Sequence, residues 1–404
     1  MADTAAHLVD RVLPEVPIRQ WVLSLPIPLR YRIAYDRELC SEVLDVFLRS
    51  VFGSLRRRAK EELGVTDGQS GSVSTLQRFG GAINLNLHVH SLILDGVYAD
   101  PKSTGIPTFH ALPAPDDPEI ARVTAAVAKR IVRLLSRRGL LPEAGQPAED
   151  PLQCDEPLLA ACASASLRGR IATGPRAGEP VMRLGDRIEP EDVDFVPGKG
   201  CASVQGFSLH AGVVVDAHDR KRLERLSRYI LRGPVATERL SRLPDGRIAY
   251  QLRHPWRDGT THVAFTELEL VEKLAVLVPP PRGHCLRYHG VLAPGAKWRA
   301  TVVRDRSECP APTPSTPPRL AALHQDLAQD LAPLRERYLC WADLIRRVFE
   351  LDVLECPRCS GKCAVIAVIT DPQVIRPFLA CLGLSTRAPP IAPARPAPQP
   401  ELPF

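Results

Sequence analysis

Residues 84–94 read NLNLHVHSLIL and place two histidines, His88 and His90, one residue apart in an otherwise apolar run. Side chains alternate between the two faces of a strand, so both imidazoles point the same way. Asn84 and Asn86 share that face, and the opposite face carries only aliphatic residues. The alternation predicts a strand with one face in the hydrophobic core and one polar face that bears the histidines.

The spacing of the two histidines suits a metal site. Two residues of strand span ~7 Å between α-carbons, which lets two imidazoles close on one divalent cation. The bare pair is also consistent with histidines that are hydrogen-bonded to asparagines on a solvated face. The apolar frame around the pair favours the ligand role. A cation held in this way can act as a Lewis acid on a phosphoryl oxygen.

The histidine stretch lies inside a longer series of predicted strands. Residues 71–98 read as two strands joined near Gly80 and Gly81, which is a hairpin signal. Further strands are predicted at 17–26 and 206–215, and residues 240–305 have the turn signals of a β-rich region.

Helices are predicted between these strands. One runs from Leu39 to Gly64, and a second covers 116–140, where an aspartate, an early proline and a closing glycine mark its ends. A third covers 216–234 and ends at a Gly-Pro pair. Residues 140–205 are rich in Pro, Gly, Ala and acids, and we expect an irregular insertion there.

Composition sets the broad class of the 404-residue protein. A hydrophobic content of 45% and a charged content of 24% are typical of a globular protein. No apolar run is long enough to span a membrane, and the N-terminus has no signal-peptide pattern, so we expect a cytoplasmic protein with no membrane partner. The net charge of +6 suits a polyanionic partner. In that compartment the eleven cysteines are expected to bind metal or remain free thiols.

A metal that activates a phosphate needs a nucleophile, and two tyrosine settings qualify. Tyr31 and Tyr35 lie one helical turn apart. Tyr229 lies at the edge of the apolar stripe of the helix 216–234. A tyrosine that attacked DNA would form a covalent phosphotyrosine link. The arginines around Tyr229 favour it modestly, because they suit backbone phosphates; these candidate DNA-binding residues are Arg225, Arg228 and Arg232.

Several motifs in order resemble the rolling-circle transposases of bacterial insertion sequences, the Helitron-related group with a His-hydrophobic-His motif and a catalytic tyrosine. They lie within residues 5–305 and read QWVLSLPIPLR, LQRFGGAINLNLHVHSLILDGVY, GFSLHAGVVV, LERLSRYILRGP, DGTTHV and RYHGVLAPGAKWR. WADLIRRVFELDVLECPRC, nearer the C-terminus, is also typical of such proteins.

The resemblance assigns roles to particular residues. It places the metal-binding motif on His88 and His90 and the catalytic tyrosine on Tyr229. Arg225 stands where two-tyrosine members have a second tyrosine, so the chain resembles the single-tyrosine branch. The third metal ligand is commonly Glu, Gln or His, and the candidates are His210 and Gln77.

The resemblance also implies a fold and a reaction. The fold is α+β, with a central antiparallel sheet, the histidines on a middle strand and helices against one face. The implied reaction is a transesterification assisted by Mg²⁺ or Mn²⁺, in which Tyr229 attacks single-stranded DNA, forms a 5′-phosphotyrosine and frees a 3′-hydroxyl. Two alternatives are a phosphodiesterase that uses water as the nucleophile and a truncated remnant that only binds DNA.

The remnant is an alternative because the beginning of the chain departs from the family. Members usually begin with a cysteine-rich, zinc-binding region, whereas MADTAAHLVDRVLP resembles the segment that follows it. We therefore expect either a misplaced start codon or a truncated element.

The C-terminal part contains a second candidate metal site. CPRCSGKC places Cys356, Cys359 and Cys363 at the spacing of half a structural zinc site. Cys340, Cys381 or a histidine could supply the fourth ligand. The expected domains are a nuclease core at 1–305, a proline-rich linker at 306–320, a helical cysteine-containing unit at 321–384 and a proline-rich tail at 385–404.

Overall fold

The computed structural model describes most of the chain as two compact units. The described residues are 1–100, 104–141, 150–185, 199–280, 284–303, 341–363, 369 and 371–386. The larger unit comprises Leu8–Val235 and Arg239–Cys309, and the smaller comprises Met1–His7, Ala236–Glu238 and Pro310–Phe404. The expected linker at 306–320 and nearly all of the expected tail lie outside the described residues, so the predicted domain boundaries stay predictions.

A six-stranded antiparallel sheet forms the centre of the larger unit, in the order β12-β2-β3-β1-β8-β7. Its strands are β1 (Ile18–Ser24), β2 (Gly71–Phe79), β3 (Leu85–Leu94), β7 (Cys201–Val204), β8 (Phe207–Val215) and β12 (Leu286–Gly290). The two histidines lie on β3, which has a partner strand on each side. The predicted α+β class with a central antiparallel sheet is confirmed.

The β2–β3 hairpin positions the histidine strand. Its turn is closed by the Gly80 amide, which donates to the Asn84 carbonyl at 2.8 Å. A β-carbon on Gly80 would meet the Asn84 side chain, which explains the glycine at this position. The register pairs Gln77 with His88 and Thr75 with His90. The hairpin predicted near Gly80 and Gly81 is therefore confirmed.

Two long helices cover the apolar face of the sheet. They are α3 (Arg37–Leu63), capped by Asp36, and α4 (Asp117–Arg137), capped by Asp116, and they contribute to one core with Leu87 and Val89 of β3. The side chains of Leu87 and Val89 are fully buried there. The predicted orientation of the strand, with this face in the core, is confirmed.

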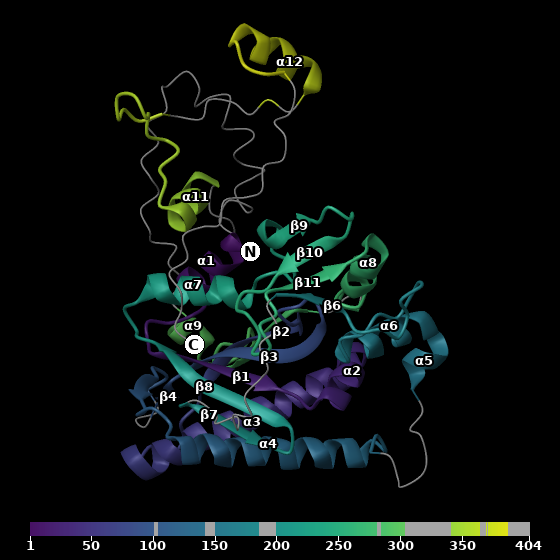
Figure 1. Ribbon diagram of the computed structural model, residues 1–404. Helices are drawn as coiled ribbons and strands as arrows, with labels where there is room; N and C mark the ends of the chain where they lie inside the picture. Colours follow the sequence, from purple (N-terminus) through teal and green to yellow (C-terminus); the bar gives the residue numbers. More distant parts are fainter. Residues whose placement is uncertain are drawn as a thin grey trace. The chain divides into compact units, whose positions relative to one another are not determined.

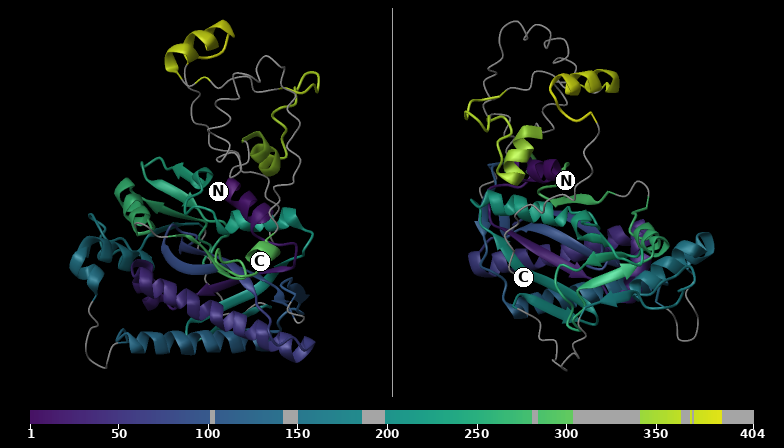
Figure 2. Two further views of the ribbon diagram at one scale, coloured as in Figure 1. Left: turned by 180° about the vertical axis from the view of Figure 1, so that it is seen from behind. Right: turned by 45° about the horizontal axis from the view of Figure 1, so that its top comes forward.

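A third helix covers the opposite face, the one that bears the histidines. Leu92 and Leu94 continue that face of β3 and pack in a second core with Leu223 and Leu226 of α7 (Arg220–Ile230). Figures 1 and 2 show α7 on one side of the sheet and α3 with α4 on the other. The long helices α3 and α4 thus lie against one face, as expected, and the helix that carries Tyr229 covers the other, because both faces of this sheet carry apolar residues that need cover.

The remaining elements of the larger unit are short. A four-stranded sheet has the order β6-β11-β10-β9, and β4 pairs with β5. The bounds are α1 (Ala2–Arg11, shared with the smaller unit), α2 (Ile27–Tyr35), β4 (Gly96–Ala99), β5 (Thr108–Ala111), α5 (Pro151–Asp155), α6 (Pro157–Leu167), β6 (Met182–Leu184), η1 (Thr237–Arg239), β9 (Leu240–Arg242), β10 (Ile248–Gln251), β11 (His262–Phe265), α8 (Glu267–Ala275) and α9 (Arg299–Val302).

The described part of the region 140–205 is more regular than expected. It contains α5, α6, β6 and the sheet strand β7. Cys162 and Ala163 of α6 are buried in the main core, and the Ser166 hydroxyl accepts from the Leu85 amide at 2.9 Å, where β3 begins. The composition was misleading because alanine, which makes this segment look irregular, is the best helix former.

Besides the first residues of α1 and part of η1, the smaller unit contains the described helices α11 (Trp341–Phe349) and α12 (Pro372–Cys381) and the cysteine cluster between them. Among the residues that the structure describes, no helix in either unit is long and apolar enough to cross a membrane.

A buried ion pair fastens three strands of the central sheet. Arg19 of β1 binds Asp95 through two hydrogen bonds of 2.7 and 3.0 Å and donates to the Ala211 carbonyl of β8 at 2.9 Å. Both side chains are about 6–7% exposed. Removing one partner of such a pair leaves the other charge buried and uncompensated.

We therefore expect Asp95→Asn to lower the free energy of unfolding by about 3–5 kcal/mol, measured by chemical denaturation. The double variant Arg19→Met/Asp95→Leu should recover most of that loss. The exposed pair Arg242–Glu267 provides the control, and Glu267→Gln should cost less than about 1 kcal/mol. If Asp95→Asn and Glu267→Gln lowered the free energy of unfolding by similar amounts, burial of the Arg19–Asp95 pair would not be the cause of the loss.

Candidate active site

The two histidines on β3 lie against each other. Their ring centroids are 4.8 Å apart, with the planes at 66°. Nδ1 of His88 lies 2.8 Å from the Asn86 carbonyl, so it carries the proton and donates to that oxygen. This tautomer leaves the lone pair of Nε2 available, which is the state that a metal-binding histidine needs.

His90 is more deeply buried, with 4% of its surface exposed. Its Nδ1 lies 2.8 Å from the side-chain amide of Gln20 on β1, and its buried Nε2 has no hydrogen-bond partner. As the amide is oriented, Gln20 donates to Nδ1. If the Gln20 amide is rotated by 180°, Nδ1 of His90 donates to Oε1 of Gln20 and Nε2 of His90 is left as an acceptor. This rotation keeps the contact between the two side chains.

Both imidazoles are held neutral by their surroundings. Burial lowers the pKa of His88, and the nearby Arg232 and Arg30 guanidiniums lower it further. Burial lowers the pKa of His90 well below its ordinary value, and the neighbouring His88, Arg232 and His210 side chains act in the same direction. A neutral imidazole is the form that can donate a lone pair to a cation.

Gln77 connects the histidine strand to the helix α7. It is buried on β2 directly opposite His88. Its Nε2 donates to the Ile230 carbonyl at 2.8 Å and, more weakly, to the Tyr229 carbonyl at 3.4 Å. Its Oε1 is buried and has no hydrogen-bond partner. An unpartnered amide oxygen beside two imidazoles has the chemistry of a third ligand.

His210 lies on β8, on the same face of the sheet but two strands away from His90. Val22 of β1 pairs with both histidines, so two strand spacings, about 10 Å, separate their α-carbons. A bulge in β8 adds one residue between Val213 and His210 and turns His210 toward this face. The Nε2 of His210 faces Gly212. A β-carbon built on Gly212 would lie 3.1 Å from that nitrogen.

The two candidate third ligands are therefore placed differently. Among the described residues, no group of three His, Cys, Asp or Glu side chains could hold a metal ion. The structure places Gln77 directly opposite His88, whereas His210 lies two strands away from His90 with its Nε2 toward Gly212.

Tyr229 faces this group from α7. The helix begins at Asp219, whose side chain accepts from the Arg222 amide, and its stripe of Leu223, Leu226 and Ile230 is buried. Tyr229 lies at the edge of that stripe, half-buried, with its ring perpendicular to His90 at a centroid distance of 6.0 Å. The predicted position at the stripe edge agrees with the structure.

The three predicted DNA-binding arginines differ in their surroundings. Arg232 stacks on the Tyr229 ring at 4.3 Å, and burial lowers the pKa of its guanidinium. Arg228 pairs with Glu224 at 3.3 Å, one turn earlier in the helix. The buried Nε of Arg225, four residues before Tyr229, has no hydrogen-bond partner.

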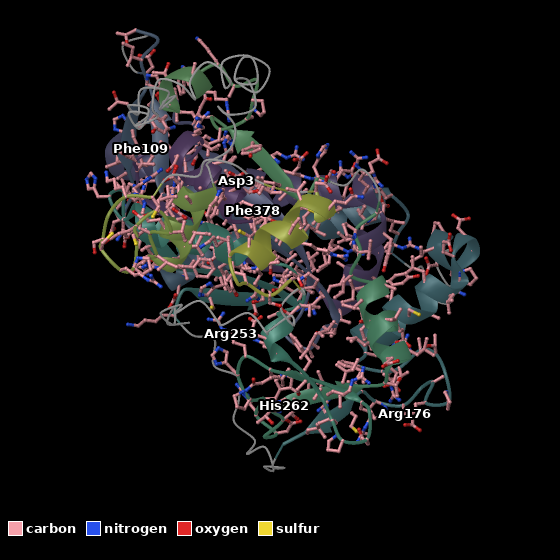
Figure 3. All side chains as sticks on the ribbon, turned by 90° about the horizontal axis from the view of Figure 1, so that it is seen from above. Asp3, Phe109, Arg176, Arg253, His262 and Phe378 are labelled. Atoms are coloured by element: carbon pink, nitrogen blue, oxygen red, sulfur yellow. The ribbon has the colours of Figure 1, made fainter. Side chains whose placement is uncertain are left out.

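Two residues near the tyrosine were missed from the sequence. Arg253, after β10 of the small sheet, lies 5.8 Å from the Tyr229 ring; it is labelled in Figure 3. Gln20 of β1 contacts His90, and a glutamine directly before the apolar run Trp21–Leu23 could have indicated it. Nothing in the local sequence of Arg253 indicates its position.

The alternative tyrosines lie on α2. Tyr31 and Tyr35 pack against the main core, on the other side of the sheet from Tyr229. Burial and the neighbouring Asp150 carboxylate raise the pKa of Tyr31. The raised pKa disfavours the phenolate, and a tyrosine nucleophile must lose its proton as it attacks.

The cysteine cluster forms a tight turn in the smaller unit. The Cys356 amide donates to the Gly361 carbonyl at 2.8 Å, and Ser360 has a left-handed backbone with φ of 55°. Backbone amides at Arg358 and Cys359 and the thiols of Cys359 and Cys363 lower the pKa of Cys356. Cys340 lies outside the described residues, and Cys381 lies at the end of α12.

A protein-family model described as "Putative transposase" matches residues 71–299. The match covers more than half of the chain and includes β2, β3 and α7. The chain belongs to this family of transposases, and DNA is the partner on which such proteins act. No curated protein matches the chain, and no solved structure matches it.

Proposed function

We propose that the protein is a rolling-circle-type transposase that nicks and joins single-stranded DNA through Tyr229. The observation that carries this proposal is the perpendicular contact between Tyr229 and His90, with ring centroids 6.0 Å apart, beside three polar groups of β2 and β3. Nε2 of His90 and Oε1 of Gln77 lack hydrogen-bond partners, and Nε2 of His88 is left with its lone pair. A tyrosine beside such a group suits phosphoryl transfer with a covalent intermediate.

The reaction exchanges one phosphodiester for another. Tyr229 Oη bonds to phosphorus and loses its proton, while the bond from phosphorus to the 3′-oxygen breaks and that oxygen takes up a proton. The products are a 5′-phosphotyrosine and a free 3′-hydroxyl. Joining is the reverse step with a second 3′-hydroxyl, so no external energy source is needed.

His88, His90 and Gln77 fit a divalent cation, and Mg²⁺ or Mn²⁺ suits phosphate chemistry. When bound, such a cation would act as a Lewis acid on the phosphoryl oxygen. Imidazole ligands also bind other metals, and the amide oxygen favours a hard cation. Gln77 has a second role, since its Nε2 holds the Ile230 carbonyl and thus the end of the helix that carries Tyr229.

Arginines around the tyrosine support DNA as the substrate. Arg232 and Arg253 both lie over the Tyr229 ring. Among the described residues, no carboxylate forms an ion pair of 4 Å or less with Arg232, so its charge suits a backbone phosphate.

The test is an adduct assay on the full chain. The protein is incubated with Mn²⁺ and single-stranded oligonucleotides that cover the DNA flanking its coding region, and a denaturing gel is read for a covalent protein–DNA band. We expect the band with single strands and not with the matching duplex or with a chelator. Cleavage without a covalent band would favour water as the nucleophile. Binding without cleavage would favour a DNA-binding remnant.

We also propose that Cys356, Cys359 and Cys363 bind structural zinc. The lowered pKa of Cys356 and the tight turn at Ser360 support a thiolate site, since thiolates are the form that binds Zn²⁺. We expect one zinc per chain by elemental analysis, and its loss in Cys356→Ser.

Cys154→Ser provides the control for this zinc site, because Cys154 is an exposed thiol of the larger unit. Equal zinc content in the two variants would contradict the site.

A further inference from the structure

The turn that joins strands β10 and β11 of the small sheet exposes a tryptophan. The turn comprises residues 252–261, which read LRHPWRDGTT. Trp256 lies in its middle, and 37% of its surface is exposed. Exposure alone does not indicate a partner, since single apolar residues are common on protein surfaces. The surroundings of this indole, however, suit a particular partner.

Hydrogen bonds fix the backbone of the turn. The Leu252 amide donates to the Thr261 carbonyl at 2.8 Å and closes the base of the turn. The Trp256 amide donates to the Thr260 carbonyl at 2.9 Å, and the Trp256 carbonyl accepts from the Gly259 amide at 2.9 Å. Trp256 is therefore held through both of its backbone groups. A side chain on a preorganised turn loses little conformational entropy when a partner binds.

A guanidinium sets the orientation of the indole. Arg183 of β6 lies over the Trp256 ring at 4.9 Å and pairs with Asp258 of the same turn at 2.9 Å. The Asp258 carboxylate also accepts from the Thr260 amide at 3.1 Å. The indole is thus held by a cation that is itself held, while more than a third of the Trp256 surface stays open to a further planar group.

The turn also carries positive charge. Arg253, His254 and Arg257 are exposed on it. Asp258 is the single acidic residue in the sequence of the turn, and its charge is already offset by Arg183. A basic segment that presents an aromatic ring suits a polyanion with planar groups, which is the chemistry of a nucleic acid.

This basic turn adjoins the proposed nucleophile, and Figure 1 shows the small sheet beside the end of α7. Arg253 lies 5.8 Å from the Tyr229 ring, on which Arg232 stacks at 4.3 Å. Burial lowers the pKa of Arg232, and the charges of Arg253 and Arg239 lower it further. Three guanidiniums therefore gather at Tyr229, and a phosphate backbone offsets the repulsion between such like charges.

Trp256 lies within reach of a strand that occupies the tyrosine site. It follows Arg253 by three residues, so their α-carbons are at most about 10 Å apart. Successive nucleotides of a stacked strand are ~3.4 Å apart along the axis. A strand whose phosphate lies at Tyr229 therefore reaches Trp256 within a few nucleotides.

We propose that Trp256 stacks on one base of the single-stranded DNA that Tyr229 cleaves, while Arg253 and Arg257 contact neighbouring phosphates. Basic residues beside an aromatic ring bind single strands with little regard to sequence, because every base has a face that stacks. A duplex cannot use this stack, since its bases are already stacked on one another. The proposal rests on the proposed function, because the tyrosine site determines where the strand passes.

The test measures the affinity of the full chain for a fluorescent oligothymidine and for a duplex of the same length, by anisotropy and without divalent metal. We expect Trp256→Ala to weaken binding of the single strand about 5- to 150-fold, the effect of one lost base stack. Duplex binding should not change, and it shows that the variant is folded. Trp256→Phe keeps a ring and should weaken single-strand binding roughly threefold or less.

The matched control is Trp341→Ala. Trp341 is an exposed tryptophan of the smaller unit, with 52% of its surface exposed, and its removal should leave both affinities unchanged. Tyr229→Phe should also bind the single strand as the unmodified chain does, because the stack does not require the hydroxyl.

A second measurement needs no variant. The chain is mixed with oligothymidine that contains iododeoxyuridine and is irradiated, which joins the modified base to an aromatic side chain stacked on it. Digestion and mass spectrometry should then find the nucleotide on the peptide that contains Trp256.

Three outcomes would overturn the stack on Trp256. They are unchanged single-strand affinity in Trp256→Ala, equal losses for the single strand and the duplex, and a cross-link that avoids Trp256. Because these measurements require no cleavage, a protein that shows the stack but forms no DNA adduct would refute the tyrosine mechanism alone. An adduct combined with normal single-strand binding by Trp256→Ala would refute only the stack.

Discussion

Tyr229→Phe is expected to abolish the covalent protein–DNA adduct and to lower the rate of cleavage at least about 10³-fold, the scale seen when an enzyme loses its nucleophile. The substitution removes one hydroxyl and keeps the ring. The ring contacts with His90 and Arg232 survive, so the helix should keep its position and the protein its stability. Adduct formation on denaturing gels measures the first expectation, and thermal unfolding measures the second.

The matched control is Tyr31→Phe, which tests the other tyrosine setting. Tyr31 lies on α2 and packs against the core on the opposite side of the sheet, so its hydroxyl should be dispensable for the adduct. Digestion of the adduct and mass spectrometry should place the nucleotide on the peptide that contains Tyr229. Loss of the adduct in Tyr31→Phe, with Tyr229→Phe still active, would reverse the assignment.

The features that the sequence predicted best are those set by local periodicity. The alternation from Leu85 to His90 allows only one face to lie in the aliphatic core, and shifting the strand by one residue would place both histidines in that core. The helical spacing of Leu223, Leu226 and Ile230 likewise allows one buried stripe and leaves Tyr229 at its edge. Periodicity therefore determined how each side chain is oriented on its own element.

Contacts between elements were not accessible in this way. That Gln77 holds the Ile230 carbonyl depends on how α7 packs over β2, more than 150 residues away in the chain. Arg253 reaches Tyr229 from the small sheet, and its own segment carries no pattern. The orientation of His210 depends on a bulge in β8, and a bulge changes which face a residue occupies without changing the sequence alternation that precedes it.

The same difference explains the error about the region 140–205. Composition describes a segment in isolation, whereas α6 is stabilised by what it contacts. Cys162 and Ala163 gain burial in the main core, and Ser166 completes the hydrogen bonding at the start of β3. A segment of small residues can therefore be an integral part of the hairpin's support.

Metal binding should distinguish the two candidate third ligands. We expect His90→Ala to weaken Mn²⁺ binding at least about 100-fold, since it removes one of the two imidazole ligands. Gln77→Ala should weaken it about tenfold or more, because Gln77 presents an unpartnered oxygen beside the histidines. His210→Ala should have little effect, because its Nε2 faces Gly212. Free Mn²⁺ measured by electron paramagnetic resonance gives the affinities, and the reverse order for Gln77 and His210 would contradict the proposed ligand set.

Gln77→Glu separates the two roles of this side chain. A carboxylate keeps an oxygen for the cation and adds charge, so Mn²⁺ affinity should be retained or increased. It cannot donate to the Ile230 carbonyl, and two acceptors facing each other in a buried site repel, which should displace the end of α7 and with it Tyr229. We therefore expect a variant that binds metal but forms the adduct at least about tenfold more slowly, a cost of ~1.4 kcal/mol in the transition state. If the rate of adduct formation instead follows Mn²⁺ affinity in both Gln77 variants, the side chain acts only as a ligand, because the hydrogen bond to α7 then makes no separate contribution to positioning the nucleophile.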